Sequence, residues 1–188
     1  MWLACKGNSS EILCCGTGLG YILLWKQCST MMITEFEETL ARHHHLHMEL
    51  QTTVPWAMYP QGVDILVFRM FDGEIHTLCR KDRVVLATKT SGRMIRSAAV
   101  DPACTCFVID NAINRFSLHR MVDSICIRTY NTNPKKTYPK QVTLAEGGTV
   151  VIGRSDDGFI YVFNKATSEL VQMLQHSFIG QVQTVTVR

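Results

Sequence analysis

The sequence contains no apolar run of about 20 residues, the length that a membrane-spanning helix needs. Its first residues also lack the basic region, apolar segment and small-residue cleavage site of a signal peptide. Both absences argue against a membrane or secreted protein. We therefore expect an intracellular chain without a membrane partner, in the cytoplasm or, alternatively, the nucleus.

Charge of one sign is also scarce. The 188 residues carry a formal net charge of +3, and their Lys and Arg are interspersed with acids. A nucleic-acid-binding face needs a cluster of cations, so we expect no nucleic acid partner. A hydrophobic fraction of 46% with 19% charged residues is ordinary for a globular chain and excludes a disordered tail.

Cysteine pairs at metal-binding or redox spacing are missing. The eight cysteines include no C-x-x-C pair, which argues against a zinc knuckle and a thioredoxin-type motif. Six of them lie inside apolar, strand-like runs: Cys14, Cys15, Cys79, Cys104, Cys106 and Cys126. We expect reduced thiols that act as small core residues.

A sustained helical period is missing as well, which argues against an α/β fold. The clearest pattern that is present is TVVIGRSDDGFIYVFNKATSELVQMLQ, residues 149–175. Residues 149–153 and 159–163 read as strands around the hairpin signal Asp157-Gly158, and residues 170–174 read as a third strand after a polar turn.

Looser copies of this unit precede it. EILCCGTGLGYILLWK, residues 11–26, places a glycine-rich turn between two apolar runs, and residues 31–37 supply a third strand. Four-strand units follow over residues 52–88 and 94–130, and the last unit opens with a strand at residues 138–142. Hairpin turns are predicted at Gly18 to Gly20, Asp72-Gly73, Asn111-Ala112 and Asp157-Gly158. Gly73 to Ala112 spans 39 residues and Ala112 to Gly158 spans 46, close to the period of about 40–45 of a WD40 blade.

Four phrases carry a family resemblance: GTGLGYILLW at residues 16–25, FRMFDGEIHTL at 68–78, FVIDNA at 107–112 and YPKQV at 138–142. With them the chain resembles the WD40-repeat family of β-propellers, and most closely divergent WD40-like proteins of fungi. No Gly-His dipeptide opens a blade and no Trp-Asp closes one. Trp25-Lys26 and Phe163-Asn164 stand at the closing positions.

The repeats and the resemblance together imply an all-β fold, a WD40-like β-propeller of about four blades with four antiparallel strands each. One domain would cover residues 1–188, with blades at about 1–41, 51–92, 93–133 and 137–176 and the first strand of a further blade at 180–188. We expect an incomplete propeller, open or truncated, that self-associates through uncovered blade faces or binds a hydrophobic dye. Trp25, Leu66, Val108, Ile152 and Phe163 are predicted to be buried between blades.

Several residue groups are candidates for chemical sites. Gly16 to Gly20 is spaced G-x-G-x-G and precedes a strand, so it reads as a hairpin turn and not as a nucleotide loop. The histidines of one connector would bind a metal only if they lay on a helix: His43, His44, His45 and His47. Four carboxylates are placed in turns, namely Asp72, Glu74, Asp156 and Asp157.

Three further histidines are isolated in different blades: His76, His119 and His176. The basic cluster of Pro134, Lys135, Lys136 and Lys140 reads as a solvated loop.

We therefore expect no catalytic, cofactor-binding or metal-binding residues, and no cofactor. A propeller enzyme would need a carboxylate or histidine set at the starts of the innermost strands, where the sequence offers Thr52, Arg96 and Lys140. The favoured function is a non-catalytic scaffold that binds other proteins or peptides. The alternative is a propeller enzyme or a small-ligand-binding or metal-binding propeller.

Overall fold

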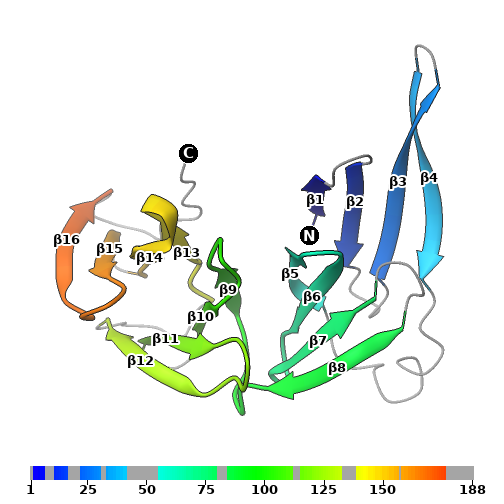
Figure 1. The fold of residues 1–188 in the computed structure, drawn as a ribbon. Helices are drawn as coiled ribbons and strands as arrows, with labels where there is room; N and C mark the ends of the chain where they lie inside the picture. The colour runs from blue at the N-terminus through cyan, green and yellow to red at the C-terminus, as the bar shows by residue number, and fades with distance from the viewer. Residues whose placement is uncertain are drawn as a thin grey trace. The chain divides into compact units, whose positions relative to one another are not determined.

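The computed structural model (Figure 1) describes residues 2–6, 11–16, 22–30, 33–41, 55–79, 84–111, 115–132, 139–156 and 158–176. For residues 2–41 it describes the backbone and, among the side chains, that of Ile22. Sixteen strands and one short 3-10 helix, η1 (Glu146–Gly148), account for the regular structure of these ranges. Within them, no helix has the length and apolar character that crossing a membrane requires.

The sixteen strands form four antiparallel sheets of four strands, and each sheet follows the order of its strands in the chain. The first sheet contains β1 (Trp2–Lys6), β2 (Glu11–Gly16), β3 (Ile22–Thr30) and β4 (Ile33–Ala41). The second contains β5 (Pro55–Gln61), β6 (Asp64–Arg69), β7 (Glu74–Leu78) and β8 (Val85–Thr90). The third contains β9 (Ser97–Val100), β10 (Cys106–Asp110), β11 (Arg115–Arg120) and β12 (Cys126–Asn131). The fourth contains β13 (Val142–Ala145), β14 (Val150–Arg154), β15 (Phe159–Asn164) and β16 (Leu170–Gln175).

The all-β class and the repeated four-stranded antiparallel unit are thus confirmed. Each sheet lies inside one of the residue ranges expected for a blade. β1 was not predicted, because its WLACK segment is short and lies outside the repeated phrases. A single propeller domain over residues 1–188 stays a prediction.

The chain divides into two compact units, residues 1–90 and residues 91–188, with two sheets in each. In the first unit, β5 contacts β1 and β2 of the neighbouring sheet. A core of Met58, Ile65, Val67 and Leu78 from the second sheet includes Ile22 of β3. Side chains from both sheets therefore share one core.

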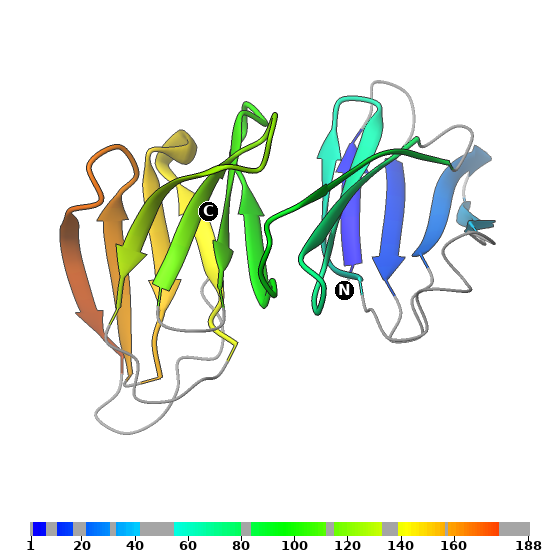
Figure 2. The same ribbon diagram turned by 90° about the horizontal axis from the view of Figure 1, so that it is seen from below.

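In the second unit, β13 of the fourth sheet contacts β9 and β10 of the third (Figure 2). Between these sheets lies a core of ten buried residues: Ala99, Cys106, Val108, Phe116, Leu118, Tyr130, Val142, Val151, Tyr161 and Phe163. The rings of Tyr130 and Phe163, one from each sheet, lie 5.5 Å apart. Burying apolar surface between two sheet faces is the main favourable contribution to this packing.

The alternation of side chains along a strand decides which predicted core residues are covered. Leu66, Val108 and Phe163 are buried, and Val108 and Phe163 lie in the core between two sheets, as predicted. Ile152 is only half-buried, so its prediction was wrong, because its neighbour Val151 points into the core and consecutive residues point to opposite faces. The side chain of Trp25 lies outside the described residues.

The first strand of the fourth sheet was also placed wrongly. The prediction was residues 138–142, but β13 is Val142–Ala145. Before it, the Lys140 N–H donates to Asp110 Oδ2 at 2.7 Å, and at its first residue the Val142 N–H donates to Ser97 Oγ at 3.1 Å. Side chains of the third sheet therefore satisfy these two N–H groups.

The predicted turn residues that the structure describes fall between consecutive strands. Gly73 and Gly158 have φ values of 69° and 85°, a left-handed conformation that glycine adopts without a Cβ penalty. Gly18 to Gly20, Ala112 and Asp157 lie outside the described residues. The Asp-Gly signal was reliable because its backbone requirement is local.

Candidate functional site

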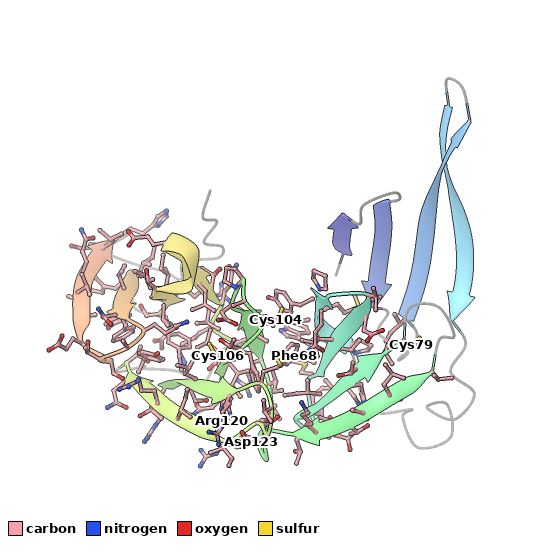
Figure 3. The ribbon with its side chains drawn as sticks, in the orientation of Figure 1. Phe68, Cys79, Cys104, Cys106, Arg120 and Asp123 are labelled. Carbon is pink, nitrogen blue, oxygen red and sulfur yellow. The ribbon has the colours of Figure 1, made fainter. Side chains whose placement is uncertain are left out.

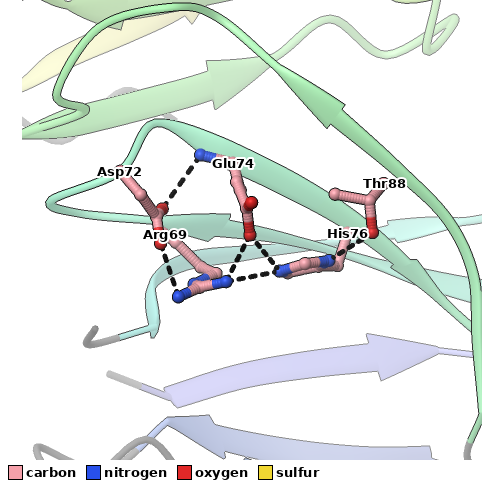
Figure 4. A network of polar contacts seen from close by, with 5 residues as sticks. All are labelled: Arg69, Asp72, Glu74, His76 and Thr88. Atoms are coloured by element: carbon pink, nitrogen blue, oxygen red, sulfur yellow. Dashed lines mark hydrogen bonds and ion pairs between the residues drawn. The ribbon is translucent and has the colours of Figure 1, made fainter. Parts of the chain in front are cut away.

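A network of polar side chains lies at the turn between β6 and β7 (Figure 4). Arg69 forms ion pairs with Asp72 and Glu74, and the Glu74 N–H donates to Asp72 Oδ1 at 3.0 Å. His76 Nε2 lies 3.1 Å from Arg69 Nη1 and 3.2 Å from Glu74 Oε2. His76 Nδ1 is hydrogen-bonded to Thr88 Oγ1 at 2.9 Å, which connects the network to β8.

This network connects the β6–β7 turn to β8 within the second sheet. Both candidate carboxylates, Asp72 and Glu74, pair with the largely buried Arg69, which had not been singled out from the sequence. The Arg69 guanidinium therefore holds both carboxylates at the turn. The only sequence signal was the spacing of Arg69, Asp72 and Glu74 around a turn, and the pairing depends on how that turn closes.

His119 has a structural environment in the third sheet. Its ring stacks on Phe107 with centroids 5.2 Å apart, Nε2 is hydrogen-bonded to Ser117 Oγ at 3.0 Å, and Nδ1 donates to the Ser124 carbonyl at 2.8 Å. Burial lowers the pKa of the imidazole, although the bond to Ser124 opposes this. His119 is therefore a neutral, hydrogen-bonded core residue.

Asp101 anchors the turn between β9 and β10. Its Oδ1 accepts the N–H groups of Thr105 and Cys106 at 2.7 and 3.0 Å, and its Oδ2 accepts the Thr105 hydroxyl at 2.8 Å. Lys165 Nζ lies 3.8 Å from Asp101 Oδ2 and 3.6 Å from Cys106 Sγ. Because Lys165 follows β15, this cluster links the third and fourth sheets.

The Asp101 cluster sets the ionisation of its members. Burial alone would raise the pKa of the Asp101 carboxyl, but the hydrogen bonds from Cys106 and Thr105, with the Lys165 ammonium, lower it below its ordinary value. Burial and the Asp101 charge raise the pKa of the thiols of Cys104 and Cys106 (Figure 3). Cys79, Cys104, Cys106 and Cys126 are reduced in the described part of the chain. Thiols with raised pKa are weak nucleophiles at neutral pH.

We expect Asp101→Asn to destabilise the protein by about 1 kcal/mol at pH 7, because the neutral amide accepts these hydrogen bonds less strongly. The folded-state pKa of Asp101 is below its unfolded value, so the carboxylate contributes stability above that unfolded value, about 3.9. That contribution is lost as the pH falls through the lower, folded-state pKa. Denaturant titrations of both proteins from pH 7 to pH 3 should show the difference shrinking with pH. A constant difference would mean that the charge of Asp101 is not responsible.

Thr52, Arg96 and Lys140 were the polar residues expected at the starts of the innermost strands. Lys140, predicted to be solvated, is 3% exposed, so that prediction was wrong. Its position next to β13 places it against the third sheet, where its N–H binds buried Asp110. Arg96 is half-buried and its N–H donates to the Asp110 carbonyl at 3.2 Å. Thr52 lies outside the described residues.

The remaining sequence candidates do not converge in the part of the chain that is described. Asp156 is half-buried in the β14–β15 turn, and His176 is exposed just after β16. The histidines at 43–45 and 47, Asp157, residues 17–20 and residues 134–136 lie outside the described residues. Among those described, no group of three or more His, Cys, Asp or Glu side chains could hold a metal ion.

The most distinctive surface feature is the outermost strand of the fourth sheet. All six residues of β16, LVQMLQ, are exposed. We call four of them the β16 edge, with exposed fractions of 50% for Leu170, 64% for Val171, 49% for Met173 and 42% for Leu174. Neighbouring apolar side chains that remain this exposed are typical of an interaction surface.

The other described outermost strands are more polar than β16. β8 contains Lys89 and three hydroxyl or small residues, and β12 contains Arg128, Thr129 and Asn131. β16 contains no charged residue and no proline. The sequence did identify residues 170–174 as a strand, but it contained no signal that both faces of that strand would be exposed.

Comparisons with known proteins give no family assignment. No protein-family model matches the chain. No curated protein matches it either.

Proposed function

We propose that this chain is a non-catalytic protein-interaction scaffold built on a divergent WD40-type β-propeller. The repeated four-stranded antiparallel sheets support the architecture, as do the contacts that the first strand of one sheet makes with the preceding sheet inside each unit. The period of the hairpin turns supports the WD40 type. An incomplete ring with uncovered blade faces remains part of this proposal.

The single observation that carries the binding function is the exposure of apolar side chains on the outermost strands. In the second unit these are Ile127 on β12 and the β16 edge. By contrast, the ionisable residues His119 and Asp101 form buried hydrogen bonds that hold turns and sheets together. The partner that suits such a surface is another protein or peptide with apolar side chains and few charges.

Affinity capture with the full chain tests this function. The immobilised chain should retain a protein that free chain displaces in a concentration-dependent manner. Ile127→Lys places a charge among exposed apolar side chains and should weaken retention of a partner that uses β12, whereas Asn131→Lys adds the same charge at an exposed polar position of the same strand. Capture of no displaceable protein by a folded chain would contradict the proposed function.

A further inference from the structure

Lys140 is a buried lysine, 3% exposed, that lies just before β13. Its side-chain nitrogen is also buried, and in the part of the chain that the structure describes no group accepts a hydrogen bond from Nζ. A lysine ammonium carries a full charge and three N–H donors. Because a buried charge is strongly unfavourable unless it is paired and hydrogen-bonded, an ammonium in this position requires an anion.

The backbone on both sides of Lys140 is held by the third and fourth sheets. The Lys140 N–H donates to Asp110 Oδ2 of the third sheet at 2.7 Å. From the fourth sheet, the Arg154 N–H donates to the Gln141 carbonyl at 3.0 Å, and Arg154 Nη2 donates to the Pro139 carbonyl. Residues 139–141 are therefore fixed in place without a ligand, and a fixed site loses little conformational entropy on binding.

Positive charge exceeds negative charge among the groups that hold this segment. The Asp110 carboxylate is 1% exposed, and its Oδ2 already accepts the Lys140 N–H. Burial lowers the pKa of the Arg154 guanidinium, and the Asp110 charge opposes this, so Asp110 acts on the charge of Arg154. One carboxylate therefore accompanies two cations, Arg154 and Lys140, and a bound anion would compensate the second.

We propose that Lys140 binds a small oxyanion, a phosphate or carboxylate group, at the junction of the third and fourth sheets; this site is independent of the proposed scaffold function. An oxyanion offers several acceptor oxygens to the N–H donors of the ammonium, and such charge-assisted hydrogen bonds are strong. The neighbouring residues Pro139, Gln141 and Arg154 are only half-buried, so the junction reaches the surface beside Lys140. The burial of Lys140 itself limits the ligand to a small group.

Denaturant titration of the full chain, with phosphate replacing chloride at constant ionic strength and pH 7, tests this site. For the wild type, phosphate at about a hundred times its dissociation constant should lower the unfolding equilibrium constant about a hundredfold. Lys140→Met removes the ammonium but keeps an unbranched apolar chain, so this variant should not respond to phosphate. The matched control is Arg128→Met, which removes the same charge from an exposed position of β12 and should respond as the wild type does.

Stability without phosphate gives a second test of the unpaired ammonium. Lys140→Met should then be no less stable than the wild type, because replacing a buried charge with an apolar side chain is neutral or stabilising when no partner is left behind. A less stable variant would show that the protein itself already stabilises the ammonium, and would overturn the proposal. So would an equal response of the wild type, Lys140→Met and Arg128→Met to phosphate, since phosphate would then act on surface charge in general.

NMR of isotope-labelled lysine side chains keeps the proposal testable if Lys140→Met folds poorly, since Lys140→Arg also identifies the Lys140 Nζ signal by its loss. This signal should shift saturably with phosphate, at the same midpoint as the stabilisation. A parallel titration with acetate shows whether a carboxylate group binds in the same way. A Lys140 signal that neither anion changes would disprove the site.

Discussion

Replacing Phe163 with alanine is expected to lower the free energy of unfolding by about 3–5 kcal/mol, the range for removing a buried phenylalanine ring. Phe163 is 3% exposed and belongs to the core between the third and fourth sheets. Its ring lies 5.5 Å from that of Tyr130 and 6.1 Å from that of Tyr161. Truncation therefore removes buried apolar surface and two aromatic contacts, and it leaves a cavity between the two sheets.

Denaturant titration followed by circular dichroism measures this loss. Val122→Ala is a suitable control because Val122 is 78% exposed in the same unit, so its truncation should change stability by less than about 0.5 kcal/mol. A loss below about 1 kcal/mol for Phe163→Ala would mean that the ring is not in the core.

Gly153→Ala should destabilise the protein by about 3 kcal/mol, the upper end of the usual range for inserting atoms into a packed core. A Cβ at Gly153 would lie 1.9 Å from Phe116 Cε2 and 2.4 Å from Phe116 Cζ. Phe116 is fully buried in the same core, so its ring has little room to move. β14 must therefore approach the third sheet at a position without a side chain.

A double-mutant cycle isolates this contact. Phe116→Leu removes the ring atoms that a new Cβ would meet, so Gly153→Ala should cost less in that background than in the wild type. Unfolding free energies of the four proteins give the coupling directly. Strictly additive effects would show that Gly153 is required for some other reason.

The sequence predicted the features of this fold that depend on neighbouring residues. The Asp-Gly signals placed turns, and β-branched and aromatic runs placed β14 and β15 to within one residue. Asp72 was correctly expected at a turn because a carboxylate there can accept a backbone N–H two residues ahead. Arg69 was missed, because its pairing with Asp72 and Glu74 requires the turn to bring three side chains together.

The β16 edge shows the same difference between features that depend on neighbouring residues and features that depend on distant ones. Residues 170–174 were recognised as a strand from composition, but the exposure of Leu170, Val171, Met173 and Leu174 depends on β16 being the last strand of its sheet. Neither their spacing nor their hydrophobicity differs from that of buried strands. No residue among the early candidates pointed to this edge.

By itself, then, the sequence determined the all-β class, the four-stranded repeat and the turn residues Gly73 and Gly158, because strand propensity and turn conformation are local properties. Only the tertiary structure decided that Val151 is buried and Ile152 is not, that Lys140 is covered, and that Gly153 lies against Phe116. Alternation assigns residues to the two faces of a sheet, but which face is buried depends on where a second sheet packs, and distant residues supply that sheet.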